Sequence, residues 1–117
     1  MYPTHVNVYN FGLIRRANKT IGLTFESNGD NQPVNFMGHT LHSEVWNKER
    51  SKKYTDFSIT VTDAPNGKLE LSLNKAQTTA LPDLVYYDLK ANTGTEEKHL
   101  LTGEISVKEG YTAWRLM

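Results

Sequence analysis

Two neighbouring segments with strict alternation of apolar and polar side chains constrain the fold of this chain most strongly. Residues 54–62 and residues 68–73 each carry an apolar side chain at every second position over most of their length. Successive side chains of a β-strand point to opposite faces, so each segment presents one apolar face. Asn66-Gly67, between the segments, provides the positive φ that a tight hairpin turn requires. We therefore predict a hairpin with one buried face. Its inward side chains are Phe57, Ile59, Val61, Leu69, Leu71 and Leu73.

The rest of the chain repeats this pattern at intervals of roughly ten residues, which is typical of an all-β sandwich. Strand-like alternation covers residues 20–25 and 40–46 and returns around residues 101–107, with polar turns between the segments. Residues 84–91 are apolar on both faces, which favours a central strand. Asn74 is suited to cap a single helical turn, and no segment sustains a longer helical period. These features predict an all-β antiparallel sandwich of six strands or so.

Length and charge exclude several classes of protein. The 117 residues are enough for one domain. Thirteen basic and thirteen acidic residues cancel, whereas nucleic-acid-binding proteins usually carry a basic excess. The chain has no cysteine, its apolar runs are far too short to span a membrane, and its first residues do not resemble a secretion signal. We expect a soluble protein, made in a cytoplasm, that binds neither nucleic acid nor membrane.

The titratable side chains do not form a pattern typical of catalysis or metal binding. His39 and His42 are three positions apart, so on a strand their rings point to opposite faces. The candidate carboxylates for acid–base chemistry are Glu44, Asp56, Asp63 and Asp88. Asp56 and Asp63 flank a predicted strand and suit turns, and we expect Asp88 to accept hydrogen bonds from backbone amides or a hydroxyl. We therefore expect a protein that is not an enzyme, with no catalytic residue, no metal and no cofactor.

The larger aromatic side chains leave a binding function of another class open. Trp46, Tyr54, Tyr86 and Tyr87 could line a sugar-binding face, as in a carbohydrate-binding module, or they could fill the sandwich core. A carbohydrate-binding module needs an exposed row of aromatic side chains on one face. With an aromatic content of 10%, core packing is the favoured interpretation.

Several short motifs, taken in order, resemble a known family. They are residues 20–25 (TIGLTF), 33–40 (PVNFMGHT), 57–63 (FSITVTD), 66–73 (NGKLELSL), 78–82 (TTALP), 86–89 (YYDL) and 100–107 (LLTGEISV). Their order and spacing resemble the immunoglobulin-like structural proteins of tailed bacteriophages. These include the N-terminal domain of upper baseplate proteins and free-standing cyanophage-type virion proteins. The resemblance covers residues 18–108 and implies an immunoglobulin-like antiparallel β-sandwich of about seven strands. Family members often have Leu-Thr-Gly where this chain has Phe36-Met37-Gly38, and Lys48 stands where they carry a basic residue.

The resemblance implies a structural protein of the virion, assembled in the host cytoplasm and present in several copies per particle. Its expected role is that of a tail or baseplate adaptor that connects tail fibres or peripheral proteins to the particle. Its expected partners are therefore other virion proteins, such as tail, baseplate or fibre subunits. A capsid decoration (cement) protein is the nearest alternative, and composition does not separate the two roles.

The two ends of the chain lie outside the family pattern. We expect residues 1–17 to form an N-terminal arm or an edge strand, residues 18–108 the sandwich, and residues 109–117 a C-terminal tail. Both ends combine aromatic side chains with arginine, the residue types enriched at protein interfaces. We predict that at least one end crosses onto a neighbouring subunit. The predicted partner-binding residues are Tyr2, Tyr9, Phe11, Arg15, Arg16, Tyr111, Trp114 and Arg115.

Overall fold

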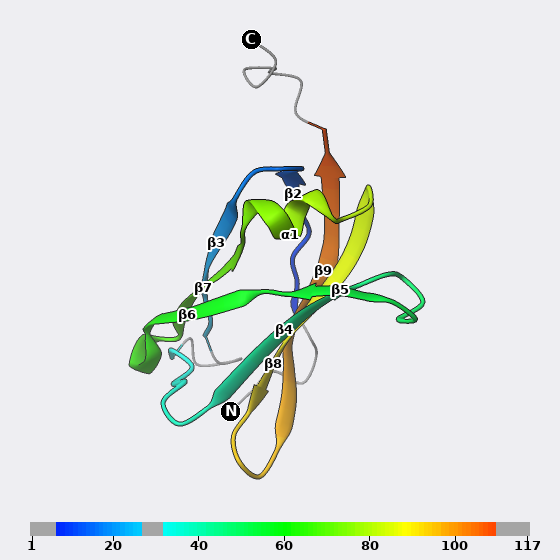
Figure 1. Ribbon diagram of the computed structural model, residues 1–117. Helices are drawn as coiled ribbons and strands as arrows, with labels where there is room; N and C mark the ends of the chain where they lie inside the picture. Colours follow the sequence, from blue (N-terminus) through cyan, green and yellow to red (C-terminus); the bar gives the residue numbers. More distant parts are fainter. Residues whose placement is uncertain (1–6, 27–31, 110–117) are drawn as a thin grey trace.

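Two β-sheets pack face to face in the computed structural model, which describes residues 7–26 and 32–109 (Figure 1). The strands are β1 (Asn7–Val8), β2 (Phe11–Ile14), β3 (Lys19–Thr24), β4 (Thr40–Trp46), β5 (Lys53–Asp56), β6 (Ser58–Asp63), β7 (Lys68–Leu73), β8 (Leu84–Asn92) and β9 (Glu97–Lys108). A 3-10 turn, η1 (Ala64–Asn66), and a short helix, α1 (Lys75–Thr79), are the helical elements among the described residues. The all-β prediction is confirmed, and the described residues hold nine strands where about seven were expected.

The larger sheet has the order β1-β9-β8-β4-β5, with β2 also pairing with β9. The smaller sheet has the order β3-β7-β6. Pairing is antiparallel except for β1 and β2, which run parallel to β9. The strand predicted to be central is confirmed, because β8 lies between β9 and β4.

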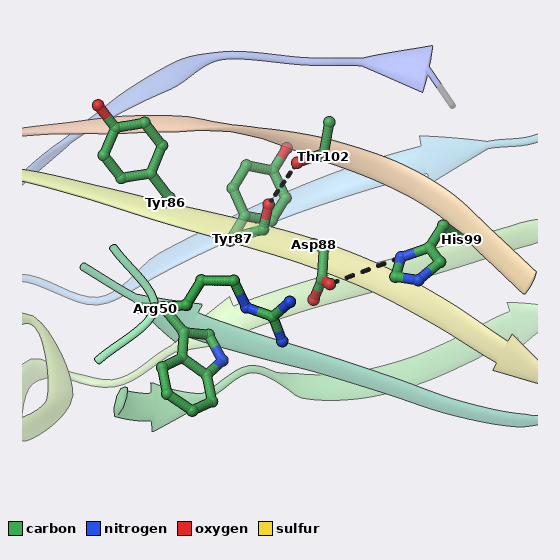
Figure 2. A pocket seen from close by; sticks show the side chains of 7 residues that line it. Arg50, Tyr86, Tyr87, Asp88, His99 and Thr102 are labelled. Atoms are coloured by element: carbon green, nitrogen blue, oxygen red, sulfur yellow. Dashed lines mark hydrogen bonds and ion pairs between the residues drawn. The ribbon is translucent and has the colours of Figure 1, made fainter. Parts of the chain in front are cut away.

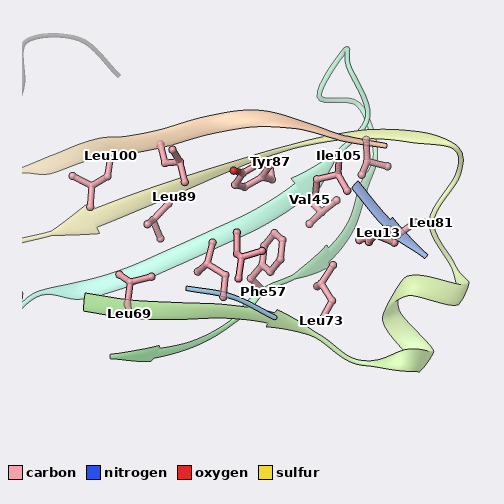
Figure 3. Packing of buried hydrophobic residues seen from close by; sticks show 14 of the residues in the cluster. Leu13, Val45, Phe57, Leu69, Leu73, Leu81, Tyr87, Leu89, Leu100 and Ile105 are labelled. Carbon is pink, nitrogen blue, oxygen red and sulfur yellow. The ribbon is translucent and has the colours of Figure 1, made fainter. Parts of the chain in front are cut away.

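The core lies between the two sheets, where the predicted alternation buries every second side chain (Figure 3). On β7 the three leucines Leu69, Leu71 and Leu73 are 1%, 0% and 1% exposed. Leu89 and Ile105, from β8 and β9 of the larger sheet, are both fully buried. The smaller sheet thus lies over the inner face of the larger sheet and leaves the outer face of β4, β8 and β9 uncovered by it.

The predicted strand of residues 54–62 divides at Phe57 and serves both sheets. Its first part is β5 of the larger sheet and its second part is β6 of the smaller sheet. Phe57 itself is buried, and its amide donates to the carbonyl of Ser43 over 2.9 Å. The prediction that Val61 faces the core is wrong, since its side chain is 41% exposed. It lies on β6, the edge of the smaller sheet, beside a register shift that ends the regular pairing with β7.

The turn between β6 and β7 differs in type from the predicted hairpin turn. Its residues form η1, and Gly67 follows with a φ of 70°, while Asn66 does not adopt positive φ. A Cβ at Gly67 would lie 2.5 Å from the carbonyl oxygen of Phe25 and 2.7 Å from that of Val34. Glycine is required here because the turn packs directly on the backbone of the segment that follows β3.

The predicted helix cap at Asn74 is confirmed. Its side chain accepts a hydrogen bond from the Gln77 amide, and the Gln77 side chain accepts one from the Asn74 amide, both over 2.8 Å. This reciprocal pair forms a capping box. Gln77 also donates to the Thr55 hydroxyl and the Asp56 carbonyl, which attaches α1 to β5.

The described part of the N-terminal segment is an edge of the sandwich. Tyr9 donates from its amide to the Thr102 carbonyl over 2.9 Å, and its own carbonyl accepts from the buried Tyr87 hydroxyl over 2.6 Å. Leu13 is 3% exposed and belongs to the core. The alternative of a free arm is therefore wrong for residues 7–14, because β9 supplies hydrogen bonds and the core supplies apolar contact. The chain passes closely over Gly103, where a Cβ would collide with the Tyr9 carbonyl and lie 2.9 Å from the Tyr87 ring.

The burial of Leu71 gives a first prediction. Leu71→Ala removes a fully buried side chain, so it should lower the free energy of unfolding by about 2 to 5 kcal/mol in chemical denaturation. Val61→Ala, on the neighbouring edge strand, should cost less than about 1 kcal/mol. Equal losses for the two variants would contradict the assignment of the inward face.

The close approach at Gly103 gives a second prediction. Gly103→Ala should lower the free energy of unfolding by about 1 to 3 kcal/mol, because the N-terminal segment must shift to accept the methyl group. Gly22→Ala is the matched control, since a Cβ there meets no atom within 4 Å. Thermal unfolding of both variants measures the difference. If the Gly103→Ala protein were as stable as the Gly22→Ala protein, the packing of residues 7–14 over Gly103 would not contribute to the stability of the domain.

Candidate functional site

The predicted partner-binding residues fall into different environments. Tyr9 is 43% exposed and stacks on Phe11, with 5.8 Å between the ring centroids. Phe11 is half-buried and packs on Phe57 and Tyr87, so it contributes to the core. The predicted residues Tyr2, Tyr111, Trp114 and Arg115 lie outside the described residues.

The two arginines after β2 are engaged within the chain. Arg15 donates to the Leu81 carbonyl over 3.1 Å and to the Asp83 carboxylate over 2.9 Å, and it also pairs with Glu109. Arg16, which has a φ of 68°, pairs with the same glutamate. The hydrogen bonds to Asp83 and Glu109 raise the pKa of Arg15 above its ordinary value. These bonds attach the end of β2 to the residues before β8 and after β9, and Arg15 remains a predicted partner contact.

An exposed apolar edge lies beside these residues. Val8 and Ile14 are 67% and 46% exposed, and with Tyr9 they place three large apolar side chains along one short stretch. We call residues 7–14 the N-terminal edge. Sequence reasoning named Tyr9 but missed Val8 and Ile14, because it assigned no face to this two-sided segment. An exposed edge strand with apolar side chains is open to pairing with another chain.

A second candidate site is a hollow on the outer face of the larger sheet (Figure 2). Its volume is about 320 Å³, and it opens to solvent. We call this cavity the hollow. It is lined by Trp46, Arg50, Tyr86, Tyr87, Asp88, His99 and Thr102. They come from β4, β8, β9 and the loop between β4 and β5.

The register of the sheet explains why these side chains gather. Trp46 lies opposite Tyr86, and Asp88 lies opposite Thr102, so two cross-strand pairs share the outer face. His99 Nδ1 lies 3.7 Å from an Asp88 carboxylate oxygen, as the dashed line in Figure 2 marks. The expectation that Asp88 bonds to amides or a hydroxyl is corrected: among the described residues its partner is an imidazole, because alternation places it on the open face.

The Trp46 ring is held in a defined orientation. Its indole N–H donates to the Glu44 carboxylate over 2.9 Å, and the Arg50 guanidinium lies 5.7 Å from its ring centroid. Arg50 has a φ of 59°, in a loop where the Asn47 side chain accepts from the amides of Ser51 and Lys52. A non-glycine residue at positive φ is uncommon, and here it directs a cation over the aromatic ring.

Glu44 also belongs to a compact charged cluster next to the hollow. His42, Glu44 and Asp56 offer three possible metal ligands within 4.8 Å of one another. The Lys53 ammonium lies 2.8 Å from Asp56 and 3.2 Å from Glu44, so a cation of this chain already occupies the space between the carboxylates. We interpret the cluster as an ion-pair network that fixes Glu44. Hydrogen bonds from His42, Trp46 and Lys53 lower the pKa of Glu44 to about 2.

The remaining predictions on aromatic and polar side chains have mixed outcomes. Trp46 and Tyr86 line the hollow, but the Tyr87 ring is 2% exposed in the core and Tyr54 packs against that core. The four aromatic side chains therefore do not form one exposed row. Asp63 accepts from the Asn66 side chain over 2.8 Å within the turn after β6.

The two histidines that sequence analysis considered together have different neighbours. The His39 ring packs 6.0 Å from that of Phe36, while His42 lies beside Glu44 on the outer face of the larger sheet. His39 precedes β4 and His42 lies within it.

No family model matches the chain, and none of the curated proteins matches it either. Among the described residues, no helix is long and apolar enough to cross a membrane.

The Glu44 network gives a third prediction. Because the folded protein lowers the pKa of Glu44, its stabilising effect is complete above about pH 4.5 and is lost as the pH falls toward 2. Glu44→Gln should therefore destabilise the protein at neutral pH, and the difference from wild type should shrink by on the order of 1 to 3 kcal/mol across that window. Glu70→Gln, at an exposed site on β7, is the control. If the free energy of unfolding changed with pH in the same way for wild type and Glu44→Gln, the proposed role of the network would be contradicted.

Proposed function

We propose that this protein is a structural protein of a bacteriophage virion that acts by binding other virion proteins. Its role is that of a tail or baseplate adaptor, with capsid decoration as the nearest alternative. The sequence motifs of residues 18–108 support the class of protein, since they resemble immunoglobulin-like phage proteins in order and spacing. We infer that the protein works by binding and not by catalysis.

The exposed N-terminal edge is the observation that carries the proposal. Val8, Tyr9 and Ile14 are between 43% and 67% exposed, on β1, on β2 and between them, at the border of the larger sheet. Isolated soluble domains usually protect such an edge with charge, proline or a covering element. A neighbouring subunit that adds a strand there would bury these side chains and satisfy the free backbone groups. This role differs from a crossing arm, because the segment stays in its own sheet and receives the partner.

Arg16 and the Arg15 network stand at the end of this edge. The ion pairs of both arginines with Glu109 link the end of β2 to the residue that follows β9. This arrangement supports a rigid docking element, since one end of the edge is clamped to the strand beside it.

The fourth prediction tests docking at this edge. Lysine is common on edge strands, so Val8→Lys should leave the domain folded. It introduces a charge where a partner strand would pack. Tagged protein carrying Val8→Lys should be at least about tenfold depleted in purified virions, a loss worth about 1.4 kcal/mol of binding. Mass spectrometry of the particles measures the copy number.

Val61→Lys is the matched control, because Val61 is also an exposed valine on an edge strand, but in the smaller sheet. It should enter particles at the wild-type level. Absence of the wild-type chain from purified virions would overturn the proposed function. Equal incorporation of the two variants would place the interface away from the N-terminal edge.

A further inference from the structure

We propose that the hollow on the outer face of the larger sheet binds one hexose-sized unit of an uncharged saccharide. This site is separate from the N-terminal edge and does not depend on the virion role. Three properties of the hollow support the assignment: its aromatic walls, its hydrogen-bonding groups and its balanced charge.

The aromatic walls suit a sugar ring. Trp46 and Tyr86 are cross-strand partners on β4 and β8, and both are partly exposed on the outer face. One face of a pyranose carries mainly C–H bonds, so it packs on an aromatic ring and removes apolar surface from water. The Glu44 carboxylate and the Arg50 guanidinium hold the Trp46 ring in place before any ligand arrives. A preorganised ring loses little conformational entropy on binding.

The polar groups around these rings suit vicinal hydroxyls. Arg50 supplies only donors, the Asp88 carboxylate supplies only acceptors, and the hydroxyl of Thr102 and the ring of His99 can serve as either. Figure 2 shows His99 beside Asp88 at one end of the hollow and Tyr86 at the other, with the Arg50 side chain extending between them. Each hydroxyl of a sugar is both donor and acceptor, so a mixed set of this kind can satisfy several at once.

The charge of the hollow favours an uncharged ligand. Arg50 contributes one positive charge and Asp88 one negative charge. Among the described residues, Asp88 lies 3.7 Å from the His99 ring and Arg50 lies over the Trp46 ring. The two charges cancel across the hollow, so an anionic or cationic ligand would leave one of them uncompensated. The volume of about 320 Å³ is at the lower limit of small-molecule sites and corresponds to one or two rings.

The test is a titration of the full chain with purified neutral oligosaccharides, followed by two-dimensional amide and indole nuclear magnetic resonance. The probes are cello-, malto-, chito-, manno- and galacto-oligosaccharides at up to about 10 mM. This concentration is needed because a site for a single ring binds weakly. A Kd of about 1 mM corresponds to a binding free energy of roughly 4 kcal/mol. At least one probe should shift the Trp46 indole and the amides of Tyr86 and Asp88. Polygalacturonate is the anionic comparison and should bind more weakly.

Variants separate stacking from hydrogen bonding. Tyr86→Ala should weaken binding at least tenfold, whereas Tyr86→Phe, which keeps the ring, should change it less than threefold. Asp88→Asn should weaken binding at least fivefold, and Glu97→Gln, a carboxylate change at an exposed position of β9 in the same sheet but outside the hollow, should have no effect. Circular dichroism of each variant confirms folding. Failure of every neutral probe, stronger binding of polygalacturonate, or shifts that avoid the hollow and persist in Tyr86→Ala would each overturn the proposal.

Discussion

The passage of the N-terminal segment over Gly103 is the constraint on which the rest of the larger sheet depends. The Tyr87 hydroxyl reaches out of the core and donates to the Tyr9 carbonyl over 2.6 Å. Burial raises the pKa of the Tyr87 phenol above its ordinary value, so it remains a donor at neutral pH. With no side chain at Gly103, the two strands approach closely enough for this bond to form. The contact makes residues 7–14 part of the sandwich and sets the outer border of the larger sheet.

Both candidate binding surfaces follow from that sheet. Val8 pairs with Thr102, which also lines the hollow, so the N-terminal edge and the hollow are neighbours on adjacent strands. The opposite face of the same strands is committed to the core, where Val45, Leu89 and Ile105 are fully buried. Period-two alternation therefore separates the roles: one set of side chains stabilises the domain, and the other set is free to bind.

Much of the fold could be predicted from residue pattern, and most of the candidate site could not. Alternation located β7 and its three buried leucines, and the Asn74 cap was visible in the sequence because it depends on neighbouring residues alone. The division at Phe57 was not visible, since β5 and β6 form one continuous apolar pattern and only tertiary pairing assigns them to different sheets. The exposure of Val61 has the same origin, because an edge position depends on which strands lie beside it.

The site depends on contacts between residues that are distant in sequence. The hollow combines Trp46 with residues of β8 and β9, and no spacing rule links them. Residue type alone groups Trp46 with Tyr54, Tyr86 and Tyr87. The register of the strands places only the rings of Trp46 and Tyr86 toward the hollow. Arg15 is a predicted partner contact because arginine is enriched at interfaces, and its ion pairs with the distant Asp83 and Glu109 were not visible in the sequence.

The central claim is that this domain serves as an adaptor that receives a partner along its N-terminal edge. An electron cryo-microscopy reconstruction of the intact particle, at a resolution that traces the chain, tests it most directly. The account predicts this sandwich in the particle with residues 7–14 paired to β9 and a neighbouring subunit packed against Val8, Tyr9 and Ile14. A particle without this chain, or a chain whose N-terminal edge faces solvent while another surface makes every contact, would contradict it.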